Sequence, residues 1–278
     1  MRKIKIVADS SCDIFSLNQV DFACAPMKII TSERQFVDDK TLNVANMTEY
    51  LYHYKGKSRS SCPNTGDWLD AFGDADDVFC VTITSGLSGS YNSACAAKQI
   101  YEDECEGRRV HVFDSLSTGP EMTLILDKIE QCVTSNMSFD DTVSAVNDYM
   151  KKTGLLFVLK SLKNFANNGR ISPIVAKLVG IAGICIVGKA SDNGTLEPMH
   201  KCRGEKKSID ALLNELQKEG FVSGRISIGH CRNENAAERL KELILEKFGN
   251  VKIEIHPLHG LCSFYAEIGG LLVGFEKE

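Results

Sequence analysis

The first half of the chain alternates between short apolar runs and stretches in which apolar residues recur at helical spacing. The runs rich in β-branched residues predict buried strands at 4–8, 22–30, 78–83 and 110–113. The stretches at helical spacing predict helices at 47–54, 65–72, 91–101, 122–133 and 143–150. Strands that alternate with helices are typical of a doubly wound, mostly parallel sheet, which binds ligands beyond the carboxyl ends of its strands.

The second half of the chain has a more mixed pattern. It predicts strands at 155–159, 184–187, 196–199, 225–229, 251–255 and 269–275, with helices at 209–216 and 237–248. The sequence Ser191-Asp192-Asn193-Gly194 lies between two of these strands and predicts a hairpin turn. We therefore predict an α/β protein with an α/β domain at residues 1–153 and an α+β domain at residues 154–278.

Composition and charge narrow the class of partner. A hydrophobic content of 43% and a charged content of 25% are those of an ordinary globular protein. The formal net charge of -5 argues against a nucleic-acid partner, because binding to phosphates needs concentrated Lys and Arg. No apolar run reaches the ~18 residues that a transmembrane helix needs. We expect no membrane span.

The cysteines and histidines do not form a metal-binding pattern. The chain has 11 cysteines and no C-x-x-C motif, which favours free thiols in a reducing compartment. His256 and His259 are three residues apart, but Pro257 disrupts a helical arrangement. The N-terminus enters a predicted strand without the apolar core of a signal peptide. We expect a cytoplasmic protein with no metal and no cofactor.

A loop of glycines and hydroxyl residues follows the predicted strand at 78–83 and carries the strongest functional signal. Its sequence is Thr84-Ser85-Gly86-Leu87-Ser88-Gly89-Ser90, and a predicted helix follows at once. The first N–H groups of a helix lack intrahelical acceptors, and the helix dipole favours an anion there. No Lys follows the glycines as in a nucleotide-binding P-loop. The loop therefore predicts a site for a small anionic group.

Three further segments are weaker candidates for the same site. Ser60 and Ser61 precede the predicted helix at 65–72, where Asn64 is the expected N-cap, and hydroxyls there are more often structural. The polar residues 114–118 follow the strand at 110–113 and suit a helix entry or a cleft rim. Arg170 and Arg203 could pair with an anion, although exposed arginines are more often solvated.

Taken together, these segments resemble the DegV family, bacterial fatty-acid-binding proteins that serve a fatty acid kinase. The likeness runs through nearly the whole chain, and the loop at 84–90 is its most specific part. The matching segments are Val7-Ala8-Asp9-Ser10-Ser11-Cys12-Asp13, Ser60-Ser61-Cys62-Pro63-Asn64, Thr84-Ser85-Gly86-Leu87-Ser88-Gly89-Ser90, Asn168-Gly169-Arg170-Ile171, Asp192-Asn193-Gly194-Thr195-Leu196-Glu197-Pro198, Lys201-Cys202-Arg203-Gly204 and Ile228-Gly229-His230-Cys231.

The resemblance implies a non-catalytic lipid carrier with a fatty acid held between its two domains. Carried over to this chain, it places the ligand's carboxylate at Ser60, Ser61, Ser85, Gly86 and Arg203. It implies that Arg170 faces the kinase and the phosphate. The expected partners are a long-chain fatty acid and a kinase subunit of the dihydroxyacetone-kinase type. A transient contact with a membrane surface stays open.

The chain departs from the family pattern near its C-terminus. The family carries H-x-G-P-G before its last apolar run, with the histidine near the carboxylate, whereas residues 266–270 here read Ala-Glu-Ile-Gly-Gly. His259 lies upstream of that register. The acyl tunnel cannot be located from the pattern, and its first candidates are Val158, Leu159, Leu162, Ile184 and Ile186.

Two other functions compete with the lipid carrier. A hydrolase or transferase would use Ser85 or Ser60 as nucleophile, which requires a general base within hydrogen-bond reach. A binding module for a small phosphorylated metabolite would use the same anion loop but would line its cavity with polar side chains. A long apolar cavity beside the loop would favour the carrier.

Overall fold

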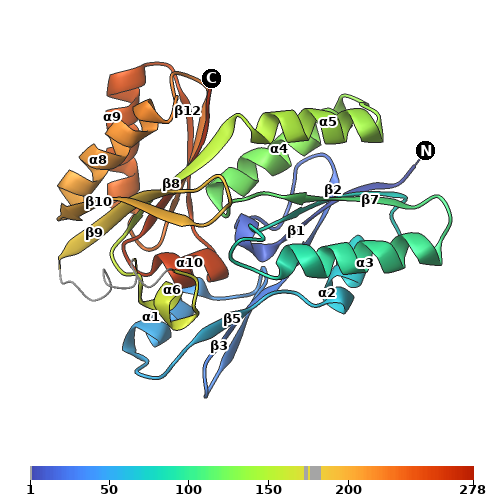
Figure 1. Cartoon of the computed structure of the whole chain (residues 1–278), viewed down its shortest axis with the longest axis horizontal. Helices are drawn as coiled ribbons and strands as arrows, with labels where there is room; N and C mark the ends of the chain where they lie inside the picture. The colour runs from blue at the N-terminus through green and yellow to red at the C-terminus, as the bar shows by residue number, and fades with distance from the viewer. Residues whose placement is uncertain (1, 172–174, 176–182) are drawn as a thin grey trace.

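The computed structural model describes residues 2–171, 175 and 183–278 and has three β-sheets with helices packed on them (Figure 1). The first sheet has four parallel strands in the order β2-β1-β6-β7. Their bounds are β1 Ile4–Asp9, β2 Asp21–Ala25, β6 Asp77–Thr82 and β7 Arg109–Asp114. Every residue of β6 is buried, as expected for a central parallel strand that is covered on both faces.

Two pairs of helices cover the first sheet. Side chains of α4 (Pro120–Thr134) and α5 (Phe139–Met150) pack with Ile6 and Phe79 on one face. Side chains of α2 (Thr65–Phe72) and α3 (Ser90–Glu104) pack with Val7 and Val78 on the other. Neighbouring residues of one strand thus point to opposite helix layers. The prediction of a doubly wound parallel sheet is confirmed.

The second sheet is mixed and has six strands in the order β10-β9-β8-β13-β11-β12. Only β11 and β12 pair in parallel, and the other pairs are antiparallel. The bounds are β8 Thr153–Leu159, β9 Ile184–Ala190, β10 Leu196–Arg203, β11 Arg225–His230, β12 Lys252–Pro257 and β13 Leu271–Glu276. Helices α8 (Glu205–Lys218) and α9 (Glu234–Phe248) bury one face of this sheet. The predicted sheet-and-helix C-terminal part is confirmed, including its hairpin.

A third, three-stranded sheet was not predicted. It consists of β4 (Gln35–Asp38), β3 (Met27–Ile30) and β5 (Arg59–Ser61), paired antiparallel. The prediction of one strand over 22–30 is wrong, because Pro26 separates β2 from β3. Proline cannot donate a hydrogen bond to a sheet, and the chain changes sheets at that residue. Helices α1 (Val44–His53) and α10 (Gly260–Ala266) pack beside this sheet.

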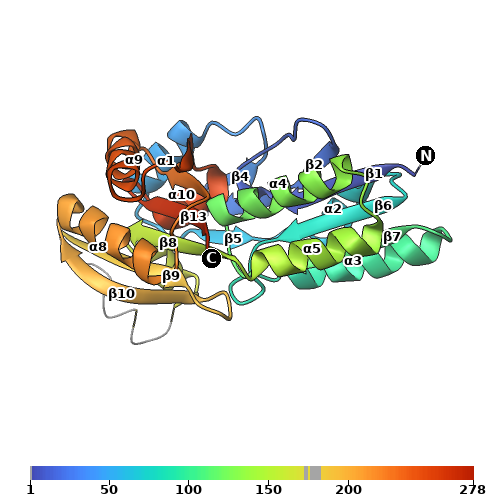
Figure 2. The same ribbon diagram turned by 90° about the horizontal axis from the view of Figure 1, so that it is seen from above.

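The two large sheets are joined by α4 and α10. Figure 2 shows α4 reaching from the first sheet toward β13, and Figure 1 shows α10 between the second sheet and the small sheet. A Cβ atom at Gly274 of β13 would lie 2.5 Å from the backbone of Pro120 and Glu121, so only glycine permits this approach of α4. All strands of the first sheet precede residue 153, whereas α4 contacts both sheets. The division at residue 153 stays a prediction.

Two expectations from composition can be compared with the structure. All 11 cysteines lie in the described part of the chain, and all are free thiols. Within residues 2–171, 175 and 183–278, no helix has the length and hydrophobicity that crossing a membrane requires. A short helix, α6 (Lys163–Asn167), follows β8 in the chain.

Candidate functional site

The carboxyl ends of β1, β6 and β7 meet, and hydrogen bonds join the loops that follow them. The fully buried Asp9 at the end of β1 accepts from the Ile83 N–H at 2.9 Å and from the Ser90 hydroxyl at 2.6 Å. Asp114 at the end of β7 accepts from the Ser85 N–H at 3.0 Å. These hydrogen bonds bring the strand ends together and hold both ends of the glycine-serine loop in place.

Within this loop, Gly86 has a role that the sequence did not indicate. Its N–H donates to the Thr84 hydroxyl at 3.1 Å, so this donor is already used within the loop. A Cβ atom at Gly86 would lie 2.6 Å from the carbonyl oxygen of Asn193, at the tip of the β9–β10 hairpin. A Cβ atom at Gly194 would likewise collide with the side chain of Thr84. The two glycines therefore let the hairpin tip close over the loop.

The start of α3 provides the anion-binding features that the loop predicts. Gly89 is the N-cap and has no side chain to cap the helix, and the Ser90 N–H donates to the Ser88 hydroxyl at 3.2 Å. The remaining N–H groups of the first turn have no intrahelical acceptor. Because α3 has 15 residues, its dipole favours negative charge beside Ser88 and Gly89.

An enclosed cavity of about 310 Å³ lies beside this helix start. That size falls within the roughly 300–1,000 Å³ typical of small-molecule sites. Its polar side chains and glycines are Ser60, Ser61, Thr84, Ser88, Gly89, Ser117, Thr118, Arg170, Gly194, Thr195 and Tyr265. Its apolar lining, with the two cysteines, is Met27, Cys62, Ile83, Leu87, Leu155, Phe157, Leu159, Phe165, Ala190, Leu196, Leu261, Cys262, Ala266 and Leu272. The walls come from strands of the second and third sheets, from the loops that follow β6 and β7 of the first sheet, and from α6 and α10.

A second, more open and more polar cavity adjoins the first. It is lined by Ser85, Gly86, Leu87, Ser88, Gly89, Gly169, Arg170, Ile171, Thr195 and Leu196. Six of these residues line both cavities: Leu87, Ser88, Gly89, Arg170, Thr195 and Leu196. The α3 N-terminus and the Arg170 guanidinium thus lie where the enclosed cavity meets the open one.

Hydrogen bonds to Asn168 hold Ser60 of the enclosed cavity close to Arg170. The Ser60 N–H donates to Asn168 Oδ1 at 3.2 Å, and Arg170 Nη1 donates to the Asn168 carbonyl at 2.7 Å. The Ser60 hydroxyl lies 2.7 Å from the Tyr265 hydroxyl. Burial raises the pKa of Tyr265, although the Ser60 hydrogen bond and the Arg170 charge oppose that rise.

The other predicted head-group residues in this region do not all line the same cavity. Ser61 lines the enclosed cavity, and its hydroxyl donates to the Cys62 carbonyl at 3.3 Å. Ser85 and Gly86 line only the open cavity.

Arg203 is not brought to either cavity. It lies at the far end of β10, seven residues beyond Leu196, which lines both cavities. That separation is roughly 23 Å at about 3.3 Å per strand residue. The structure thus joins Ser60, Ser61 and Arg170 in one cavity and does not bring Arg203 to them.

Of the five candidate tunnel residues, one lines the cavity. Leu159 does so together with Phe157 and Leu155, which are two and four residues away and share its face of β8. Val158 points to the opposite face and packs in the cluster beneath α8 and α9. Leu162, Ile184 and Ile186 pack in the cluster next to the cavity rather than along its wall.

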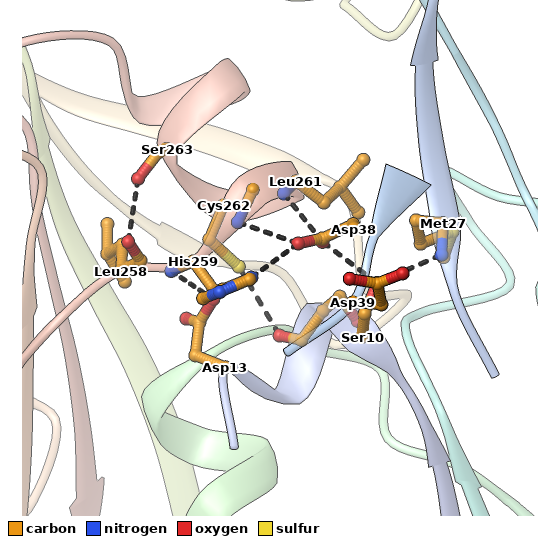
Figure 3. Close-up of polar contacts among 12 residues, drawn as sticks. Ser10, Asp13, Met27, Asp38, Asp39, Leu258, His259, Leu261, Cys262 and Ser263 are labelled. Carbon is orange, nitrogen blue, oxygen red and sulfur yellow. Dashed lines mark hydrogen bonds and ion pairs between the residues drawn. The ribbon is translucent and has the colours of Figure 1, made fainter. Parts of the chain in front are cut away.

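Helix α10 supplies four lining residues that sequence reasoning missed, namely Leu261, Cys262, Tyr265 and Ala266, and the buried carboxylate of Asp38 holds its start. Asp38 at the end of β4 is fully buried and accepts from the N–H groups of Gly260 and Leu261 at 2.9 and 2.8 Å. It also accepts from the Ser10 hydroxyl at 2.8 Å, and His259 Nδ1 lies 2.5 Å away. Figure 3 shows Ser10, His259 and Leu261 grouped around Asp38.

Asp13 completes this cluster from the other side of His259. It accepts from the His259 N–H at 2.8 Å, while its second oxygen is buried without a hydrogen-bond partner. Burial raises the pKa of Asp13 to about 8, with a further contribution from the negative charge of Asp38. Burial alone would lower the pKa of His259, but the hydrogen bond to Asp38 and the nearby carboxylates outweigh it and raise that pKa.

Among the described residues, no group of three or more His, Cys, Asp or Glu side chains is arranged to hold a metal ion. The chemistry offered by the two cavities is that of hydroxyls, backbone N–H groups and one guanidinium. Such a set binds an oxygen anion at one end of an apolar cavity. The fold and the site thus define a protein that binds an elongated, amphipathic, anionic small molecule.

The sequence matches the DegV family of uncharacterised proteins over residues 3–278. It is 44% identical over 278 residues to a DegV domain-containing protein of Streptococcus pneumoniae, with 99% of each chain covered. It is 42% identical over 276 residues to one of Streptococcus gordonii, with 98% of each covered. The chain belongs to the DegV family.

Solved structures of related proteins are similar to this one throughout. The Fak B3 fatty acid kinase protein of Streptococcus pneumoniae, loaded with linoleic acid, matches with a TM-score of 0.96 and 43% identity. A DegV family protein of Eubacterium eligens, loaded with heptadecanoic acid, matches with a TM-score of 0.96 and 41% identity. Each comparison covers 99% of this chain and 100% of the other.

Substituting Gly86→Ala tests the closure of the hairpin over the loop. The new methyl group would collide with the Asn193 carbonyl, so we expect a loss of about 1–3 kcal/mol in the free energy of unfolding. Gly89→Ala is the matched control, because its Cβ would make an ordinary 3.6 Å contact with Cys62 Sγ. Urea denaturation measures both. Equal stability of the two variants would contradict this packing.

The buried cluster predicts that stability falls as the pH rises. Unfolded Asp13 ionises near pH 4, whereas folded Asp13 keeps its proton until about pH 8, so the folded state binds more protons between these values. The free energy of unfolding should therefore fall with pH over that range, by at most about 1.4 kcal/mol per pH unit from this group. The raised pKa of His259 acts in the same direction above pH ~6.5.

The variant Asp13→Asn isolates the contribution of Asp13, because an amide keeps the hydrogen-bond acceptor and does not titrate. Denaturation at pH 5, 6, 7 and 8 should give a shallower decline for the variant than for the wild type. Parallel declines would mean that Asp13 is not the group responsible.

Proposed function

We propose that this chain is a non-catalytic carrier that binds a long-chain fatty acid and presents its carboxylate to a partner kinase. The observation that carries the proposal is the enclosed, mainly apolar cavity with its hydroxyl and guanidinium groups at the junction with an open polar cavity. The bound fatty acids of the pneumococcal and Eubacterium relatives support it, because this chain shares their fold over its whole length.

The apolar part of the cavity suits an acyl chain. Leu155 and Phe157 of β8 and Leu272 of β13 line it from the second sheet, and Met27 and Leu261 line it from the opposite side. Each buried CH₂ group contributes about 0.8 kcal/mol. With roughly fifteen methylenes, the chain would dominate the affinity even after its ordering cost is subtracted.

The polar groups of the cavity mainly orient the ligand, whereas the apolar lining contributes most of the binding free energy. Ser60, Ser61 and the start of α3 offer neutral donors, and Arg170 adds a positive charge. A hydrogen bond to a charged group is worth about 1.5–3 kcal/mol. These donors would hold the carboxylate at the cavity mouth, and we assign Arg203 no contact with it.

The open cavity suits the approach of a phosphoryl group. Its lining combines Ser85, the α3 N-terminus and Arg170 around a space that is accessible from outside. Formation of an acyl phosphate requires the kinase, a dihydroxyacetone-kinase-like subunit, to bring its phosphoryl donor to the carboxylate from this side. A cytoplasmic location and a transient membrane contact stay predictions from the sequence.

The observations favour this carrier over the two alternatives. A serine nucleophile needs a general base, whereas the hydroxyl beside Ser60 belongs to Tyr265, whose pKa is raised and which therefore stays protonated at neutral pH. A module for a phosphorylated metabolite would need a polar enclosed cavity, whereas the enclosed cavity here is mainly apolar.

Organic extraction of the purified protein followed by mass spectrometry tests the carrier directly. We expect about one long-chain fatty acid per chain, or stoichiometric uptake when fatty acid is added to delipidated protein. A protein that carries none and takes up none would contradict the proposal.

Two serine substitutions test separately the binding of the fatty acid and the presentation of its carboxylate to the kinase. Ser60→Ala removes a donor in the enclosed cavity and should weaken fatty-acid binding about tenfold, the equivalent of about 1.4 kcal/mol. Ser85→Ala changes only the open cavity and should leave binding within twofold while slowing phosphoryl transfer by the kinase. Titration calorimetry and a phosphoryl-transfer assay give the two readouts. Unchanged binding and transfer in both variants would reject this assignment.

A further inference from the structure

Tyr265 lies at the polar end of the enclosed cavity and has no assigned role. It belongs to α10, and its hydroxyl lies 2.7 Å from the Ser60 hydroxyl although the two residues are 205 positions apart. Both residues line the cavity, as does Arg170. The phenol therefore reaches the point at which the proposed function requires a carboxylate.

The ring of Tyr265 is held so firmly that its hydroxyl has a defined position. Phe165 packs against it with ring centroids 4.6 Å apart, and Phe264 packs edge-on at 4.8 Å. The first turn of α10 is fixed by the hydrogen bonds from Gly260 and Leu261 to the buried Asp38. A donor that is already in place loses little entropy when it binds a ligand.

We propose that the Tyr265 hydroxyl donates a hydrogen bond to the ligand's carboxylate alongside Ser60, and that this pair selects a carboxylate over a neutral head group. This inference rests on the proposed function. Without ligand, one hydroxyl must donate to the other, which leaves a single hydroxyl proton free. A carboxylate only accepts hydrogen bonds, and it offers two oxygens, so each hydroxyl can donate to one of them.

The surroundings of the pair support this role. The Ser60 N–H is already used by Asn168, so the hydroxyls are the donors that these two residues offer to a ligand. Burial raises the pKa of Tyr265, which keeps the phenol protonated as a donor at neutral pH. An alcohol offers one neutral oxygen, which both hydroxyls would have to share and which accepts weaker hydrogen bonds than a carboxylate does.

The test compares Tyr265→Phe with the wild type for a fatty acid and for the fatty alcohol of the same chain length. We expect the variant to bind the acid about tenfold or more weakly and to bind the alcohol within twofold of the wild type. The preference for acid over alcohol should therefore fall by the same factor. Tyr149→Phe is the matched control, because Tyr149 is partly buried and donates to Glu276 Oε1 at 2.8 Å outside the cavity.

The possible outcomes are distinguishable. An unchanged acid affinity in Tyr265→Phe would overturn the inference, and an equal loss for acid and alcohol would contradict the proposed selection of a carboxylate by the hydroxyl pair. In Ser60→Ala, where Tyr265 is intact, part of the acid preference should remain, and the double variant should lose it. A wild-type protein that binds neither ligand would refute the proposed function itself.

Discussion

The buried carboxylate of Asp38 is the contact on which the geometry of the cavity depends. Its two oxygens join three segments that are distant in sequence: the 3-10 turn Ser10–Cys12 after β1, the end of β4, and the start of α10. Ser10 in turn accepts from the Met27 N–H at 2.9 Å, so the first residue of β3 is tied to the same centre. A buried charge is tolerated only with this degree of hydrogen bonding, so removing any one partner should disturb all three segments.

The position of α10 decides which side chains line the cavity. This helix has only seven residues, and a helix so short has little stability of its own. Its place is set by Asp38 at its first N–H groups and by the packing of Phe264 with Ile29 and Met47. Once it is placed, Cys262, Tyr265 and Ala266 become cavity wall. The cavity is thus a consequence of three sheets meeting around one short helix rather than a property of either large sheet alone.

Local signals in the sequence predicted the features that depend on local interactions. Asn64 caps α2 through a full capping box with Asp67, and the strand-loop-helix pattern located the loop that leads into α3. Long-range contacts had no such signal. Nothing in the chain around Tyr265 indicates that its hydroxyl meets Ser60, and an aromatic residue between apolar neighbours is most simply read as core. Arg203 matched a motif, but the length of β10 carries it away from the cavity.

Glycines illustrate the same difference between pattern and structure. Gly86 suggested a backbone that approaches a ligand, whereas the observed close neighbour is the carbonyl of Asn193 in the hairpin. A glycine indicates that another group comes close to the backbone, but only the tertiary structure shows that this group is a carbonyl of the hairpin. Arg170, by contrast, lines both cavities, and the turn that carries it is bound to β5 through Asn168.

A crystal structure of the protein with a bound long-chain fatty acid would test the carrier most directly. The orientation of the ligand follows from the two ends of the cavity. The carboxylate should lie within hydrogen-bond distance of the Ser60 and Tyr265 hydroxyls, and the acyl chain should run along Leu155, Phe157 and Leu272. A carboxylate at the apolar end, or an acyl chain bound outside this cavity, would contradict it.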